Sequence, residues 1–227
     1  MNNTVSSLEA IAKSRAIKRA ICILSLGSRL ITNDYILSVI TTAKEHSWPL
    51  LVILLDTMEE VNLRFFEGEH PEGGKQSVRL RCEEIDRFLS HVRATQMWQV
   101  AAIKFSALTN TEEYRELFGS IDLLYKSNRR FRDLCLQQTF RNLHPRLTRA
   151  GVRNQRDRVV KGLVEYLLGE IALKLYLASC IPDTIEIAPV PEMSIMERVY
   201  AGEFRGVITS GARRMEHVVL RPKEEEA

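Results

Sequence analysis

Short apolar runs alternate along this chain with segments in which apolar residues recur every three or four positions. Four runs rich in β-branched residues predict strands over residues 20–26, 49–55, 100–105 and 184–189. The periodic segments predict helices after a cap at Asn33–Asp34 and over residues 75–94, 112–126, 128–143, 157–176 and 194–200. Strands that alternate with helices are typical of a parallel sheet flanked by helices, so the expected fold class is α/β.

Turn and capping residues divide these elements from one another. The run Pro71–Gly74 predicts a loop, and His144–Pro145 predicts the end of the helix that starts at residue 128. Thr111 and Ser194 are the expected N-caps of the helices that follow them, because a hydroxyl oxygen can accept from a free N–H of the first turn.

The helix expected over residues 157–176 carries two polar side chains on an otherwise apolar face. Tyr166 and Glu170 are one helical turn apart, and Leu173 or Lys174 continues the same face. Burying a carboxylate among leucine, isoleucine and alanine is costly unless it is paired or protonated. Glu170 is therefore either turned to solvent by a roll of the helix or part of a functional site.

Length and composition indicate one globular domain. The chain has 227 residues, of which 45% are hydrophobic, enough for a full core. We expect the domain to span residues 20–204, between an N-terminal helix or arm (1–19) and a C-terminal extension (205–227) with a disordered end. The net charge is only +3, yet residues 126–161 alone carry +9. This segregation predicts a polyanionic partner, or it marks a basic helical pair that faces solvent.

Several common kinds of site are missing from the sequence. No CxxC, HxxxH or HExxH spacing occurs, so we expect no metal site, and the four cysteines are expected to be buried free thiols in a reducing compartment. The glycine patterns of dinucleotide and P-loop sites are also absent, so no cofactor is expected. No segment predicts a membrane span or a cleavable signal peptide. We therefore expect a cytoplasmic protein.

The first predicted strand ends in Ser25-Leu-Gly-Ser28, at the edge where open parallel sheets bind their ligands. Ser25 could serve there as a nucleophile, and Gly27 allows a tight turn that presents backbone N–H groups. Asp56 ends the second strand at the same edge, where its carboxylate could bind a basic group or simply face water. No histidine stands near a candidate aspartate in the sequence, so a hydrolase triad is unsupported. A serine at a strand end can equally be a plain turn residue.

These motifs and their separation resemble those of the cyclodipeptide synthases. In that family an apolar strand ends in Gly-apolar-Ser, matched here by Ile21-Cys-Ile-Leu-Ser25. The second family motif is Tyr-apolar-x-x-Glu-x-Pro, matched here by Tyr166-Leu-Leu-Gly-Glu170-Ile-Ala172. The resemblance covers residues 19–204. It implies a single Rossmann-like domain similar to the catalytic domain of class I tyrosyl- and tryptophanyl-tRNA synthetases.

The chain departs from the family pattern at three places. Ile23 stands where the family has a glycine two positions before the serine, and Ala172 stands where it has a proline. The family's tyrosine on a later strand has no evident counterpart, because residues 187–190 read Ile-Ala-Pro-Val; Pro189 matches a branch that has a proline there. In length the chain is similar to a divergent fungal group of arginine-containing cyclodipeptide synthases.

The resemblance implies a tRNA-dependent aminoacyltransferase that makes a diketopiperazine without ATP, cofactor or metal. Ser25 would form the aminoacyl-enzyme, and Tyr166 and Glu170 would hold the substrate ammonium. The expected substrate-binding residues are Gly27, Ser28, Asp56, Leu173 and Pro189. The expected tRNA-binding residues are Lys75, Arg79, Arg81, Arg87, Arg129, Arg130 and Arg132. Further expectations are an arginyl substrate near Asp56, aminoacyl-tRNAs as the partners, and a monomer or homodimer.

Two other classes of protein stay open. An inactive RNA-binding protein on the same scaffold would fit the missing glycine and tyrosine. A small α/β hydrolase would fit the serine at the strand end, but it would need a histidine that the sequence does not place.

Overall fold

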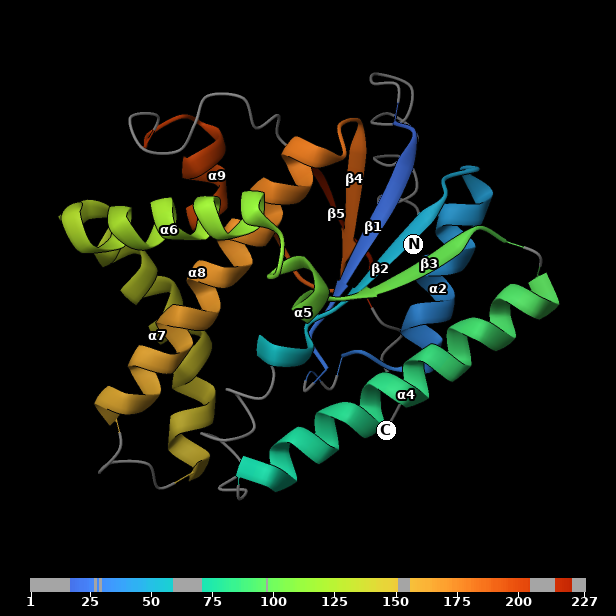
Figure 1. Ribbon diagram of the computed structural model, residues 1–227, viewed down its shortest axis with the longest axis horizontal. Coiled ribbons are helices and arrows are strands. Elements are labelled where there is room, and N and C mark those ends of the chain that lie inside the picture. Colours follow the sequence, from blue (N-terminus) through green and yellow to red (C-terminus); the bar gives the residue numbers. More distant parts are fainter. Residues whose placement is uncertain are drawn as a thin grey trace.

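Five parallel strands form the sheet at the centre of the molecule (Figure 1). The computed structural model describes residues 17–26, 28, 30–58, 71–96, 98–150, 156–204 and 215–221. Its strands are β1 (Arg19–Leu24), β2 (Leu50–Leu54), β3 (Val100–Lys104), β4 (Thr184–Ala188) and β5 (Glu216–Val219), in the order β3-β2-β1-β4-β5. The strand order changes direction between β1 and β4, and parallel α/β sheets bind their ligands beyond the carboxyl ends of the strands at such a point.

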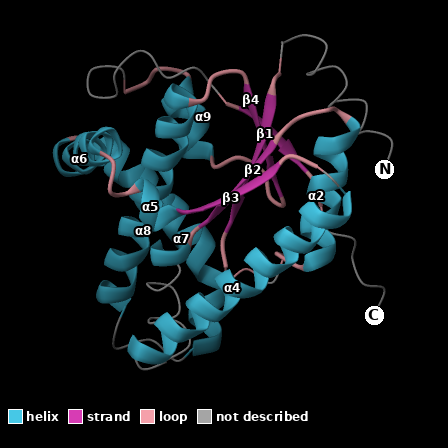
Figure 2. Cartoon of the chain, turned by 45° about the vertical axis from the view of Figure 1, so that its right-hand side comes forward, coloured by secondary structure: helices cyan, strands magenta, loops and turns pink. Residues whose placement is uncertain are grey.

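Helices cover both faces of this sheet. One face carries α2 (Asn33–Glu45) and α4 (Pro71–Gln96), and the other carries α6 (Glu112–Ser127), α7 (Arg129–Ala150), α8 (Arg156–Cys180) and α9 (Ser194–Tyr200) (Figure 1, Figure 2). The short α5 (Phe105–Leu108) follows β3 directly. The expected α/β class is thus confirmed. Within the described ranges, no helix has the length and apolarity that a membrane crossing requires.

The alternation of side chains along β1 divides the core into two layers. Ala20 and Cys22 pack with α2 and α4, whereas Ile21 and Ile23 pack with α8 and its neighbours. Both faces of the strand are buried, which explains why the strands read as continuous apolar runs. Ser25 continues the series of Ile21 and Ile23, so the alternation directs it to the layer that contains α8.

The strands and helices predicted between residues 20 and 204 are all present, but three details of the prediction are wrong. Pro71–Gly74 forms the first turn of α4 rather than a loop, and proline is tolerated there because the N–H it lacks would have no helical partner. The backbone of α7 remains helical through Pro145 to Ala150, since one proline in a 22-residue helix removes only one backbone hydrogen bond. Cys180, expected to be buried, is exposed at the end of α8.

The helix caps are partly as expected. Thr111 is the N-cap of α6. The cap of α2 is Thr32, one residue earlier than the expected Asn33–Asp34. Met193 holds the N-cap position of α9, and the hydroxyl of Ser194 instead donates to Gln138 Oε1 at 3.2 Å. This last bond ties α9 to α7.

The sequence pattern does not predict β5. The strand has four residues, of which only the two valines are apolar, so it carries little periodic signal. It pairs with β4 in a register that sets His217 beside Glu186. The sheet therefore extends into the segment that the sequence analysis treated as a C-terminal extension. Residues 1–16 and 222–227, which include most of the expected N-terminal helix and the expected disordered end, lie outside the described residues.

Candidate active site

A cavity of about 530 Å³ lies at the carboxyl ends of β1 and β4, against α7 and α8. Among the residues expected at the site, those that line it are Ser25, Ser28, Tyr166, Glu170 and Pro189. Further polar lining comes from residues that the sequence analysis did not assign: Gln138, Thr139, Lys174, Glu186 and His217. The proposed nucleophile and the proposed ammonium-binding pair therefore share one cavity, although they come from distant parts of the chain.

Ser25 follows β1 in the turn that leads to α2. Its carbonyl accepts a hydrogen bond from Ser28 N at 3.0 Å, which closes the turn. The Ser28 hydroxyl accepts from Leu30 N at 3.3 Å, so Ser28 also stabilises the chain direction after the strand. Gly27, between the two serines, lies outside the described residues. The turn thus presents two hydroxyl-bearing residues at the sheet edge.

Every fourth residue of one α8 stripe faces the cavity, namely Tyr166, Glu170 and Lys174. Another side of α8 is fixed by close packing, because Gly169 is buried and its carbonyl accepts from Tyr114 Oη of α6 at 3.3 Å. A Cβ atom on Gly169 would lie at the ordinary contact distance of 3.6 Å from Tyr114 Oη. Because Gly169 packs against α6 while Glu170 lines the cavity, the alternative in which α8 rolls Glu170 away to solvent is wrong.

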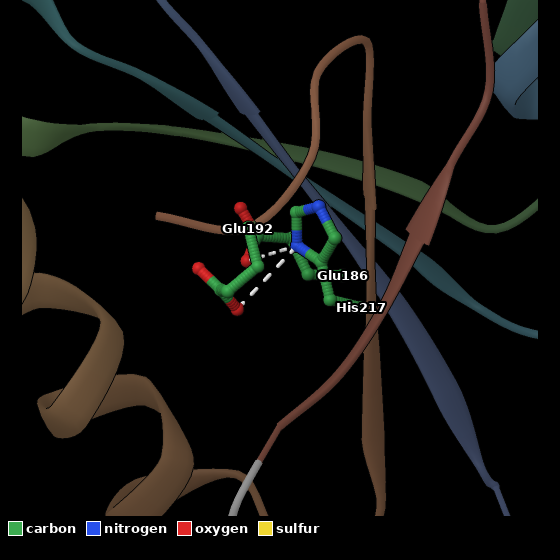
Figure 3. A group of neighbouring side chains, drawn as sticks. All are labelled: Glu186, Glu192 and His217. Carbon is green, nitrogen blue, oxygen red and sulfur yellow. Dashed lines mark hydrogen bonds and ion pairs between the residues drawn. The ribbon is translucent and has the colours of Figure 1, made fainter. Parts of the chain in front are cut away.

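Four buried side chains form an ion cluster beside Glu170, made of Lys174, Glu186, Glu192 and His217. Lys174 Nζ lies 2.7 Å from Glu186 Oε2 and 2.8 Å from Glu192 Oε1. His217 Nδ1 lies 3.2 Å from Glu186 Oε2 and 3.6 Å from Glu192 Oε2 (Figure 3). All four side chains are at most 7% exposed. The cluster connects α8, β4, β5 and the loop after β4.

Burial and the mutual charges of these groups shift their pKa values in opposite directions. Burial raises the pKa of Glu170, and Lys174 only partly offsets that effect. Burial alone would lower the pKa of Lys174, but three surrounding carboxylates outweigh it and raise that pKa. Burial also opposes ionisation of Glu186, yet Lys174 and His217 hold its pKa below the ordinary range. The charged cluster thus lies next to Glu170, a carboxyl group that burial makes easier to protonate than a carboxyl group in water.

Glu186, Glu192 and His217 also satisfy the donor requirement of a metal site, since one ligand atom from each lies within 4.8 Å of the others. The Lys174 ammonium, however, already lies at hydrogen-bond distance from both carboxylates. A metal ion would have to displace a buried ammonium whose pKa is raised. The Lys174 ammonium thus occupies the position between the two carboxylates that a metal ion would take.

Two expected substrate-binding residues lie away from the cavity lining. Asp56 accepts hydrogen bonds from Ser106 N at 2.9 Å and from its hydroxyl at 2.5 Å, so the carboxylate is occupied at the start of α5. Leu55 packs with the α8 layer, and the alternation after β2 turns Asp56 toward the other layer. Leu173 is fully buried in the core, and its neighbour Lys174 faces the cavity instead. The end of a strand predicts that Asp56 lies at the ligand-binding edge of the sheet, but it does not predict toward which face of the sheet the side chain points.

The expected tRNA-binding residues divide between two sides of the sheet. Those on α4 are Lys75, Arg79, Arg81 and Arg87, and those on α7 are Arg129, Arg130 and Arg132 (Figure 1). Several already have acidic neighbours: Arg79 lies 3.7 Å from Glu83, Arg129 lies 3.8 Å from Asp133, and Arg130 lies 2.5 Å from Glu203. The two groups therefore lie on helices that cover opposite faces of the sheet.

A second, open hollow of about 490 Å³ adjoins the cavity on the α4 side. It shares Ser28 and Ile31 with the cavity and extends to Arg81. Arg81 donates to the Ile31 carbonyl at 2.7 Å and pairs with Glu84 at 2.6 Å, so its guanidinium is held in place beside the turn after β1. The basic residues of α4, rather than those of α7, thus have a hollow that leads to Ser28.

The family model described as cyclodipeptide synthase matches residues 9–205, which include Ser25, Tyr166, Glu170, Lys174 and Glu186. The chain therefore belongs to the cyclodipeptide synthase family. No curated protein matches its sequence.

Solved structures agree on the fold. A cyclodipeptide synthase from Bacillus thermoamylovorans is 18% identical with a TM-score of 0.74, over 94% of this chain and 91% of that one. One from Fluoribacter dumoffii is 15% identical with a TM-score of 0.70, over 92% of each chain. A tyrosyl-tRNA synthetase from Archaeoglobus fulgidus is 13% identical with a TM-score of 0.55, over 95% of this chain and 59% of that one. The Rossmann-like fold predicted from the sequence is confirmed.

The sequence analysis missed the ion cluster, although two signals pointed to it. Glu186 interrupts the apolar run Ile185–Ile187, and Lys174 interrupts the apolar stripe of α8. An ionisable residue in the middle of a buried element needs a partner. His217 could not be found in this way, because β5 itself was not predicted.

Proposed function

We propose that this protein makes a diketopiperazine from two aminoacyl-tRNAs through an aminoacyl-enzyme on Ser25. The observation that carries the proposal is the shared cavity, in which Ser25 faces the same space as Tyr166 and Glu170. Membership of the cyclodipeptide synthase family supports the same reaction. An aminoacyl-tRNA is already an activated ester, so the reaction needs no ATP.

The reaction proceeds in three acyl transfers. Ser25 Oγ attacks the ester carbonyl of the first aminoacyl-tRNA, its proton passes to the leaving 3′-terminal oxygen, and the tRNA departs. The amino group of a second aminoacyl-tRNA then attacks the seryl ester, which forms a peptide bond and returns the proton to Ser25. Finally the free amine of the dipeptidyl-tRNA attacks its own ester, closes the six-membered ring and releases the second tRNA.

Tyr166 and Glu170 hold the substrate ammonium in this scheme. Burial raises the pKa of Glu170, so its neutral form is easier to populate in the cavity than in water. An entering ammonium supplies the missing counter-charge and favours the carboxylate, because opposite charges at close range lower a carboxyl pKa. The Tyr166 phenol adds a hydrogen bond. When the ammonium later loses a proton to become the attacking amine, Glu170 is positioned to accept that proton.

Arginine is our proposal for one of the two amino acids. The carboxylate that the sequence suggested for it, Asp56, is bonded to Ser106, so it is not the recognition group. Glu170 and Glu186 line the cavity, and the guanidinium of an arginyl substrate could bind a carboxylate there through two N–H groups.

The substrates reach the cavity from the α4 side in this proposal. Arg81 and the exposed Lys75, Arg79 and Arg87 would contact tRNA phosphates, which requires no sequence readout. The hollow that connects Arg81 with Ser28 supports this direction. We further propose that the enzyme works in the cytoplasm, where its aminoacyl-tRNA partners are, as a monomer or homodimer without a metal ion or cofactor.

Mass spectrometry of culture medium after heterologous expression tests the proposed function. The wild type should add a diketopiperazine absent from the host control, and its mass would identify both residues. Ser25→Ala should lose the product, while the matched change Ser28→Ala should retain it. A product that persists in Ser25→Ala would contradict Ser25 as the nucleophile.

An inactive RNA-binding protein remains the alternative that one observation favours. Ala188 and Pro189 line the cavity in the region where the family has its later tyrosine, so no phenol is supplied from there. Absence of any diketopiperazine, together with retained tRNA binding, would support this alternative. A hydrolase is disfavoured, because the histidine at the cavity has both ring nitrogens against acceptors, Glu186 and the Val190 carbonyl.

A further inference from the structure

A five-residue stretch after β4, residues 189–193, forms part of the cavity wall and is here named the wall segment. Pro189, Val190, Pro191 and Met193 of this segment line the cavity. Two of its residues are prolines, which have no N–H to donate. Within the described part of the chain, we find no backbone–backbone hydrogen bond to residues 189–192. The wall segment therefore depends on side chains for its position.

Two side chains from other elements hold the wall segment. Lys174 Nζ on α8 lies 2.8 Å from Glu192 Oε1, and His217 Nε2 on β5 lies 2.9 Å from the Val190 carbonyl. Glu192 Oε1 also accepts from Met193 N at 3.3 Å, which orders the end of the segment before α9. Figure 3 shows the His217 ring between β5 and the wall segment, with Glu192 directed toward it.

The surroundings of His217 identify its protonation state. Its Nε2 faces the Val190 carbonyl and its Nδ1 faces Glu186 Oε2 at 3.2 Å, and both partners can only accept hydrogen bonds when Glu186 is ionised. Lys174 lowers the pKa of Glu186 against the effect of burial and so favours its carboxylate form. Both ring nitrogens must therefore carry a proton, and only the imidazolium has two N–H groups. A neutral ring would leave one nitrogen lone pair directed at an oxygen.

The charges around His217 favour the imidazolium. Burial opposes its charged form, but the hydrogen bond to Glu186 and the nearby carboxylates outweigh burial and raise the pKa of His217. The charged or titratable groups around the cluster are Glu170 and Lys174 on α8, Glu186 on β4, Glu192 on the wall segment and Tyr200 on α9. The positive charge of Lys174 lowers the pKa of His217, whereas the carboxylates raise it.

We propose that His217 is a positioning residue whose imidazolium fastens the wall segment to the sheet and whose deprotonation releases it. The cavity wall then becomes sensitive to pH. Because the folded pKa lies above the ordinary value of about 6.5, both contacts are complete below that value. As the pH rises through the folded pKa, the ring loses one of its two protons. Nδ1 keeps its proton because it faces the Glu186 carboxylate, so Nε2 loses its hydrogen bond to the Val190 carbonyl and the wall segment is released. The inference does not require that the cavity transfers acyl groups.

Nitrogen NMR of the full-length, ¹⁵N-labelled protein tests the protonation state directly. At pH 7 the His217 ring should show two protonated nitrogens, and its titration midpoint should lie above that of an ordinary histidine. The chain has five histidines, so the signal is assigned by its loss in His217→Gln. Glu192→Gln, which removes a negative charge 3.6 Å from His217 Nδ1 and leaves Lys174 bonded to Glu186, should move the His217 midpoint downward. This second variant keeps the test available if His217→Gln fails to fold.

Amide hydrogen exchange tests the release of the wall segment. Protection at Met193, whose N–H donates to Glu192 Oε1, should fall about tenfold in the wild type as His217 loses its proton, after correction for the intrinsic rate at each pH. This factor corresponds to one charge-assisted hydrogen bond of about 1.4 kcal/mol. His217→Gln should show the low value at every pH. His91→Gln, at an exposed site on α4, is the matched control and should behave as the wild type.

Each outcome decides for or against the proposal. A neutral His217 ring at pH 7, with one nitrogen unprotonated, would overturn it. Protection that stays constant through the His217 titration would also overturn it, since the ring would then titrate without holding the wall. Neither measurement uses tRNA, so failure here is distinguishable from failure of the proposed enzyme activity.

Discussion

Replacing Lys174 by methionine removes the only lysine or arginine of the ion cluster while keeping a long, flexible side chain. Lys174 is 3% exposed and bonds to Glu186 at 2.7 Å and to Glu192 at 2.8 Å. Removing one partner of a buried ion pair costs about 3–5 kcal/mol, because the other charge is left without compensation. A domain of this size loses about 2–4 °C of melting temperature per kcal/mol, so we expect a decrease of about 6–20 °C.

Thermal and urea unfolding of Lys174→Met measure this loss against a matched control. Lys126→Met also removes a lysine bonded to an acid, Asp122, but that pair is exposed on α6. Exposed pairs contribute less than about 1 kcal/mol, so the control should melt within a few degrees of the wild type. If both variants lose the same small amount of stability, the cluster does not act as a buried ionic network.

A double variant checks the electrostatic origin of the effect. Adding Glu186→Gln to Lys174→Met removes one of the carboxylates that the first change leaves uncompensated. Neighbouring residues in one ionic network are not additive, so the double variant should be less destabilised than the sum of the single changes. Additive losses would show that Lys174→Met acts through lost packing alone.

Two further predictions concern substrate binding. Glu170→Gln should lower kcat/KM for aminoacyl-tRNA about 100-fold, which corresponds to about 2.7 kcal/mol for a lost charge-assisted contact to the ammonium. The control Glu165→Gln, on the exposed side of α8, should change kcat/KM less than twofold. Equal effects of the two changes would show that Glu170 does not belong to the site. Charge reversal of Arg81 should weaken tRNA use and reduce its salt dependence, while charge reversal of Arg130 on α7 should leave both nearly unchanged. Filter binding and steady-state rates at several salt concentrations measure these effects. A larger effect of the Arg130 change than of the Arg81 change would show that α7 binds the tRNA.

The sequence predicted the parts of the fold that carry a strong hydrophobic period. The strands β1, β2 and β4 read as apolar runs because both of their faces are largely buried, whereas the edge strand β3 is partly exposed. The polar stripe of α8 stood out against an apolar helix. That is why Ser25, Tyr166 and Glu170 could be proposed together. Spacing along α8 could not decide between Leu173 and Lys174, because adjacent positions differ by only about 100° around a helix.

Other features depend on contacts between helices and strands, and the hydrophobic pattern of a single segment does not predict such contacts. Asp56 ends a strand at the expected edge, but the face it takes and its bonds to Ser106 follow from the pairing of β2 with its neighbours. His217 enters the site only because a short edge strand pairs beside β4. The helix α7 also continues through Pro145, so a local helix-breaking signal did not decide where the helix ends.

Labelling of the enzyme by its substrate tests the central claim most directly. Purified protein is incubated with tRNA charged with radiolabelled amino acids, quenched in acid and digested, and the labelled peptide is sequenced. We expect one label per molecule at most, carried as an ester on the peptide that contains Ser25, and no label in Ser25→Ala. Undiminished labelling of Ser25→Ala, or a label that maps to Ser28, would contradict the assignment of Ser25 as the nucleophile.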